Sequence, residues 1–438
     1  MSTERLRVWF TNRPPSIKGK VVAGSLALII LLMATPRIAG PLWWSIMRPA
    51  DMREIEGHRM QWEGVLLHRS IHAMLTAVTP PDVISGLTTD EYRALLPIYT
   101  AVITTRITSS LHLGMTFADL FWWWLGSLAV VALARRLGTG WVVASVAGFL
   151  TASSPLAAAF TGTAQLHTAS SLALPVAALL AWDAMNGDRR PFVGKALVTG
   201  FAIFLSSVTY TYQWTLIPWL LGLSLVARRP GTWFLLTSAS VGVFVALSMA
   251  AREVLRFGGL TVHPHLNDPV RIIMDRTATA QEGGASSTLQ LVIALATSML
   301  SGLPDVVVGT ITSYHPLIAL LAVVGTFGAT RVQNAWLAIA TVIALAQGTI
   351  YGVPWVLMSA FPLVYISAAN GSMQVGKACS AMGRRSLGTP RGVMARCLMN
   401  PLTTVAVLTT VATAVTNLDL IGDATFVIQW WGSWYMPH

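Results

Sequence analysis

Long apolar stretches alternate with short polar segments along most of this chain. Runs such as 21–33 and 398–416 contain no charged residue, and several reach about the 20 residues that a helix needs to cross a hydrocarbon core. Their apolar positions are contiguous, whereas the strands of a membrane barrel alternate between apolar and polar residues. The pattern therefore predicts an all-α protein, a polytopic transmembrane helical bundle.

The apolar runs predict about eleven crossings. Two further stretches, 97–113 and 288–312, are expected to be embedded or interfacial and not to span. The pair between Lys195 and Arg228 is short for two crossings, but charges at both ends favour a hairpin. The crossings are expected at 21–46, 116–134, 141–161, 166–184, 196–212, 214–227, 232–250, 315–330, 333–350, 352–369 and 398–417.

Composition supports a membrane location. Of the 438 residues, 54% are hydrophobic and 11% charged, and the mean hydropathy is +0.61. Soluble domains carry about 25% charged residues, so this chain lacks the polar surface of a soluble protein. The net charge of +11 indicates no nucleic-acid partner, because the basic residues collect in the short turns on one side of the membrane.

That charge asymmetry predicts the topology. With the N-terminus inside, the inside loops hold 18 of the 29 basic residues, but only three acids: Glu4, Asp183 and Asp188. Positive inside loops are the rule for helical membrane proteins. We therefore expect a cytoplasmic N-terminus (1–20) and an aromatic C-terminal tail (418–438) outside.

Two long segments fall outside the membrane, at 48–115 and 251–314. They are too rich in apolar and aromatic residues for disorder, and loops of this length are often functional. With no internal repeat or low-complexity linker, residues 1–438 are expected to form a single transmembrane domain.

The first outside loop contains the candidate catalytic carboxylates, Asp51 and Glu54, just beyond the first crossing. A carboxylate close to the membrane plane can accept a proton from a hydroxyl that attacks a lipid-linked substrate. The alternative is a solvated face whose acids pair with neighbouring arginines such as Arg53.

The second outside loop is locally cationic, with Arg256, His263 and Arg276 among its residues. Arginine suits phosphate binding because its planar fork matches the phosphate oxygens. Anchoring to lipid headgroups explains these residues equally well. The histidine spacings in both loops do not make a metal set, so no metal site is predicted.

Arg106 and Asp119 lie in strongly apolar surroundings, where ionisable residues are functional candidates. A structural pair between the two is the alternative. Asp119 precedes Phe121–Trp124, which is expected to form an aromatic belt at the outer interface.

Neither a Walker loop nor a Rossmann glycine fingerprint occurs in the sequence, so nucleotide use at the cytoplasmic face is unsupported. No cofactor is required by the sequence, and dependence on a divalent metal is left open.

The layout resembles the GT-C fold of membrane glycosyltransferases, such as protein mannosyltransferases and aminoarabinose transferases. Three segments carry this resemblance over roughly 20–370. They are Leu-Ala-Arg-Arg-Leu-Gly at 133–138 followed by Ser154-Pro155, Thr-Asp-Glu-Tyr-Arg-Ala-Leu-Leu-Pro at 89–97, and the stretch 351–365 with its tyrosines and spaced prolines.

The resemblance implies a glycosyltransferase that moves a sugar from a polyprenyl-phosphate carrier to an acceptor at the outer face. It implies Asp51 or Glu54 as the base, with inversion at the sugar carbon. The expected substrate- and phosphate-binding residues are Arg53, Arg106, Arg256, His263, Arg276 and Tyr351.

The alternative is a non-catalytic polytopic protein, either a transporter or an accessory subunit of a membrane complex. The expected partners are membrane lipid and a lipid-linked sugar, without nucleic acid, and partner membrane subunits are left open. The expected location is the bacterial inner or plasma membrane.

Overall fold

The computed structural model describes residues 95–109, 111–154, 167–186, 191–207, 216–226, 229–255, 277–279, 281–283, 287–351, 361–387, 404–405 and 407–411. Within these ranges the regular structure is helical and no β-strand occurs, which confirms the predicted all-α class. The helices are α6 (Leu95–Thr108), α7 (Leu111–Arg136), α8 (Trp141–Ala152), α10 (His167–Asn186), α11 (Phe192–Ser207), α12 (Leu216–Val226), α13 (Pro230–Leu255), α15 (Thr288–Ser301), α16 (Leu303–Tyr314), α17 (Pro316–Gly325), the 3₁₀ turn η4 (Thr326–Gly328), α18 (Arg331–Tyr351) and α19 (Phe361–Leu387).

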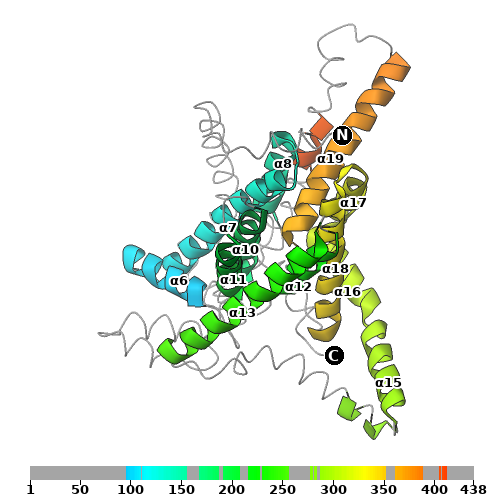
Figure 1. Cartoon of the computed structure of the whole chain (residues 1–438). Coiled ribbons are helices and arrows are strands. Elements are labelled where there is room, and N and C mark those ends of the chain that lie inside the picture. Colours follow the sequence, from blue (N-terminus) through cyan, green and yellow to red (C-terminus); the bar gives the residue numbers. More distant parts are fainter. Residues whose placement is uncertain are drawn as a thin grey trace, which may run out of the picture.

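The long helix α7 runs from α6 toward α8 (Figure 1). It packs against α6, α8 and α10, and also touches α19. From α10 the contacts continue through α11 and α13 to α12 and then α18. Helices α17 and α19 form a closely packed pair that meets α8 along α19. Segments distant in the sequence therefore share one core.

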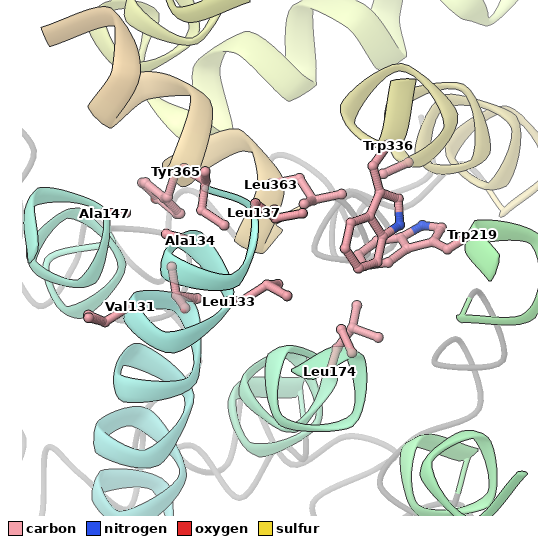
Figure 2. Close-up of a cluster of buried hydrophobic side chains, with 14 of the residues drawn as sticks. Val131, Leu133, Ala134, Leu137, Ala147, Leu174, Trp219, Trp336, Leu363 and Tyr365 are labelled. Carbon is pink, nitrogen blue, oxygen red and sulfur yellow. The ribbon is translucent and has the colours of Figure 1, made fainter. Parts of the chain in front are cut away.

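The core is built of side chains from most of these helices (Figure 2). The largest fully buried side chains are Trp123, Trp219, Trp336 and Tyr365. Trp336 stacks on Trp182 with ring centroids 5.5 Å apart and meets Trp219 edge-on at 5.6 Å. These contacts join α10, α12 and α18, and such ring pairs add about 0.5–1.5 kcal/mol each beyond burial.

Small residues set the spacing of α17 and α19. A methyl group at Gly371 would lie 2.7 Å from the carbonyl carbon of Leu321, so the two backbones approach too closely for any larger residue. The Ser367 hydroxyl donates to the carbonyl of Ala322 at 2.7 Å across the same seam. Close approach through small residues is typical of helix pairs in membranes.

Helix α13 has the properties of a spanning helix. Its segment Pro230–Ala250 has a mean hydropathy of 1.8, and only 17% of its most apolar window is buried inside the protein. Exposed apolar side chains, including Phe234 and Leu235, cover its outer face. Among the described helices it alone meets the length and hydropathy expected of a span. The other apolar helices in the described ranges are shorter, so the predicted number of crossings stays a prediction.

Two helix boundaries differ from the expected ones. The stretch 97–113 is interrupted, because α6 ends at Thr108, Ser109 has a φ of 55°, and α7 already begins at Leu111. The last long helix, expected at 352–369, is described from Phe361 and continues to Leu387. An apolar run limits the part of a helix that can lie in lipid, but it does not end the helix, and the polar residues after 369 simply continue it.

Candidate functional site

Most of the predicted site residues lie outside the described residues. This holds for the carboxylates Asp51 and Glu54, for Arg53, and for the second-loop residues Arg256, His263 and Arg276. Tyr351 is described only as the last residue of α18, without its side chain. The grouping of these residues around a substrate therefore remains a prediction.

Arg106 is the one predicted binding residue whose surroundings the structure describes. It lies in the last turn of α6 and is exposed. The exposed fractions of its neighbours Ile103 and Ile107 are 58% and 77%. An arginine among exposed aliphatic side chains suits the border between lipid and water, where its stem contacts apolar groups and its guanidinium reaches phosphate.

The hairpin between α6 and α7 fixes the position of Arg106. The Thr104 hydroxyl donates to the backbone carbonyl of Gly114, and the indole N–H of Trp122 donates to the Thr100 hydroxyl at 3.3 Å. A methyl group at Gly114 would collide with the backbone of Thr105, so glycine is required for this contact. The turn at Ser109 and these bonds hold the end of α6 against the start of α7.

The expected aromatic belt is largely internal. Trp122 is 6% exposed, and Trp123 is fully buried and donates its indole N–H to the carbonyl of Thr151 at 3.3 Å. Phe121 does remain 43% exposed. The run Phe121–Trp124 continues around a helix, so its members face different directions and only part of it can face lipid. The Asp119 side chain lies outside the description, and its pairing with Arg106 stays untested.

The other end of α7, about 38 Å away for a helix of 26 residues, is the arginine end of the bundle. We use this name for the region around Arg135, Arg136, Lys195 and Arg331. Arg136 forms a two-pronged ion pair with Asp183 in the last turn of α10, at 2.5 and 3.0 Å. The hydrogen bond that Arg136 donates to the Asp183 carboxylate raises the pKa of Arg136. Both side chains are about half exposed, so the pair contributes about 1 kcal/mol at most.

Arg135 lies against the aromatic start of α8. Its guanidinium carbon is 4.6 Å from the centroid of the Trp141 ring, and it also donates to the carbonyl of Thr139. Burial, with the charge of Arg136, lowers the pKa of Arg135. The contacts of Arg135 with Trp141 and Thr139 stabilise the turn between α7 and α8 at the arginine end.

A polar junction, formed by Leu137, Gln333, Asn334, Ser367 and Asn370, joins α7, α18 and α19 near the arginine end. Gln333 donates to the carbonyl of Leu137 at 2.8 Å and accepts from the side-chain amide of Asn370 at 3.4 Å. Gly138, with a φ of 90°, ends α7, which leaves the carbonyl of Leu137 free to accept from outside its own helix. No motif in the sequence marks this junction. The only signal is Gly138, which follows Arg-Arg-Leu and indicates a helix end.

No group of three or more His, Cys, Asp or Glu residues that could hold a metal occurs in the part of the chain that the structure describes. The described surroundings of Arg106 thus offer a guanidinium at an apolar border, which can bind an anionic headgroup. They do not include the carboxylate that a proton transfer needs.

No protein-family model matches the chain, and no curated protein matches it in sequence. Solved structures do match it in fold. The chain aligns over 89% of its length with the apo oligosaccharyltransferase of Archaeoglobus fulgidus, at 13% identity and a TM-score of 0.52. The same enzyme in complex with Zn and sulfate gives 14% identity, 89% coverage and a TM-score of 0.51. ArnT from Cupriavidus metallidurans bound to undecaprenyl phosphate aligns over 94% of this chain and 78% of its own, at 13% identity and a TM-score of 0.44.

The likeness of fold rests on the two oligosaccharyltransferase structures, of which the chain spans about half the length, 56% and 53%. The expected resemblance is thereby confirmed for the fold alone, which this chain shares with the two oligosaccharyltransferase structures.

Proposed function

We propose that this chain is a glycosyltransferase that moves a sugar from a polyprenyl-phosphate carrier to an acceptor at the outer membrane face. The observation that carries the proposal is the GT-C fold, shared with an oligosaccharyltransferase over 89% of the chain. The exposed Arg106 adds support, because it lies at the end of α7 opposite the arginine end. By the positive-inside rule the arginine end would face the cytoplasm and Arg106 the outer side, in keeping with this proposal.

The reaction would be a single displacement. The acceptor hydroxyl oxygen forms a bond to the anomeric carbon while the bond from that carbon to the carrier phosphate breaks. Asp51 or Glu54 takes the proton of the hydroxyl, and the polyprenyl phosphate leaves with the electron pair of the broken bond. One displacement inverts the configuration, since no second nucleophile restores it.

Arginines would stabilise the leaving phosphate. Arg106, with Arg53, Arg256 and Arg276, supplies charge-assisted hydrogen bonds to the phosphate oxygens, and these bonds strengthen as negative charge develops there. His263 and Tyr351 would complete the binding of carrier and sugar. No metal is assigned a role in these steps.

The test is transfer activity in reconstituted lipid. The purified full chain is incubated with a set of polyprenyl-phosphate-linked sugars, and release of polyprenyl phosphate is measured. Asp51→Asn or Glu54→Gln should abolish release, whereas Glu56→Gln, a neighbouring carboxylate in the same loop, should keep it. Full activity in both Asp51→Asn and Glu54→Gln would reject these residues as the base.

A structure in lipid gives the second readout. Elongated density ending in a phosphate near Arg106 would support a carrier site. A closed outer face covered by other subunits, together with no release from any donor, would favour the accessory-subunit alternative.

A further inference from the structure

The polar junction encloses a small cavity between α7, α18 and α19. Its volume is about 10 Å³, close to what one water molecule requires. Its apolar lining residues include Ala329, Leu337, Leu363 and Ile366. The polar part is formed by Gln333, Asn334, Ser367 and Asn370.

One of the residues that line this cavity has a buried side-chain oxygen without a donor among the described residues. The side-chain oxygen of Asn334 is inaccessible to solvent and accepts no hydrogen bond from the described residues. Its orientation is fixed, because the amide nitrogen of Asn334 donates to the carbonyl of Thr326 at 2.9 Å. Turning the amide over would place its oxygen against that carbonyl, so the unpaired atom has to be the oxygen. A buried acceptor without a donor costs about 1–3 kcal/mol.

We propose that the polar junction binds one buried water molecule, which donates a hydrogen bond to the side-chain oxygen of Asn334. Neighbouring groups can complete its bonding. The Asn370 amide has a second N–H besides the one that reaches Gln333, and the Ser367 oxygen, which donates to Ala322, can still accept. Buried waters in proteins make about three such bonds.

The chemistry of the wall favours water over a cation. None of the residues lining the cavity has a carboxylate, and three side-chain amides with a hydroxyl present both donors and acceptors. A divalent cation needs about six oxygen ligands and usually carboxylates among them. A neutral molecule that donates and accepts fits this wall, and a volume of about 10 Å³ leaves room for nothing larger than water.

The bound water would hold together parts of the chain that are far apart in sequence. The bond from Gln333 to Leu137 joins positions 196 residues apart, and Asn370 adds α19. Asn334 is next to Gln333 on α18, so a water on Asn334 would couple the start of α18 to the same junction.

The decisive variant is Ala329→Val, which fills the cavity from its wall. Ala329 has extended backbone angles, which valine accepts without strain. If the cavity holds water, the added methyl groups expel it and leave the Asn334 oxygen unpaired, so the Tm falls. If the cavity is dry, the methyl groups expel nothing, and any change in Tm comes from packing alone, which does not depend on the Asn334 oxygen.

The matched control repeats Ala329→Val in an Asn334→Leu background, where no buried oxygen needs the water. There the fall in Tm should be smaller than in the native background, because only the crowding of the methyl groups remains. A map of the full chain in lipid, at a resolution that shows other buried waters, should also show one peak within about 3.2 Å of the Asn334 oxygen.

The proposal is overturned by any of three results. One is a rise in Tm on Ala329→Val in the native background, and another is an equal fall in both backgrounds. The third is a map that resolves other buried waters and leaves this cavity empty. The same holds for a map whose peak in this cavity has five or more oxygens within about 2.6 Å, as expected for a cation.

Discussion

The tight seam between α17 and α19 gives a quantitative test of the fold, through the variant Gly371→Ala. The new methyl carbon would lie 2.7 Å from the carbonyl carbon of Leu321 and 3.1 Å from the amide nitrogen of Gly325. The atom nearest to the new methyl carbon is the carbonyl oxygen of Leu321, and ordinary contact begins at 3.4 Å. The two backbones must therefore separate by more than the 0.7 Å that the carbonyl carbon alone requires. The opposing atoms are backbone, and no side-chain rotation can relieve the overlap.

The expected cost has two parts. Overpacking of a close interface costs about 1–3 kcal/mol. Separation of the helices also stretches the 2.7 Å bond from Ser367 to Ala322, and a lost hydrogen bond costs about 0.5–1.5 kcal/mol. Together they predict a loss of about 2–4 kcal/mol in the free energy of unfolding, which lowers the Tm by roughly 2–4 °C.

The assay is thermal unfolding of the purified chain in detergent, followed by the fraction that stays monodisperse after heating. Gly242→Ala is the matched control, because Gly242 lies inside α13 and a methyl group there meets nothing within 4 Å. Alanine in a helix is about 0.5–1 kcal/mol more stable than glycine, so this variant should unfold at the same or a higher temperature. An unchanged Tm in Gly371→Ala would refute the close approach of α17 and α19.

Three more predictions follow from single side chains. Arg106→Ala should raise the KM for a polyprenyl-phosphate donor at least tenfold in steady-state assays, and Arg106→Lys should give an intermediate KM. KM values equal to that of the native chain would remove Arg106 from the carrier site. Trp336 is fully buried, so Trp336→Ala should lower the free energy of unfolding by about 3–5 kcal/mol, measured by thermal or chemical unfolding. A loss below about 1 kcal/mol would contradict the place of Trp336 in the core. Arg136→Ala should lower the free energy of unfolding by at most about 1 kcal/mol, because the ion pair of Arg136 with Asp183 is half exposed. A double-mutant cycle that shows a larger coupling energy, independent of salt, would disprove this value.

The helices themselves could be predicted from the sequence, but their ends less well. The uncharged runs mark the positions of α10, α13 and α18 within a few residues. An uncharged run is expected in lipid or in the protein interior, where backbone N–H and C=O groups need hydrogen bonds, and a helix forms these bonds within itself. Helix α19 continues 18 residues beyond the crossing expected at 352–369, since polarity limits a span and not a helix.

The candidate site could be predicted only as a set of residue types. Arg106 stood out because a charge in apolar surroundings is costly, and the structure places it exposed beside the α6–α7 turn. The polar junction gave no comparable signal. Gln333, Asn334 and Asn370 are ordinary residues in the sequence, and only their approach to Leu137 makes them a junction.

The sequence by itself determined the helical class of this protein, because its uninterrupted apolar runs favour helices over the alternating pattern of strands. Which helices are neighbours was decided by the tertiary structure alone. The contact of Gln333 with Leu137, 196 residues away, and the fit of Gly371 against Leu321 depend on shape and on pairing of polar groups. Such pairings leave no periodic trace in the chain, whereas hydrophobicity does.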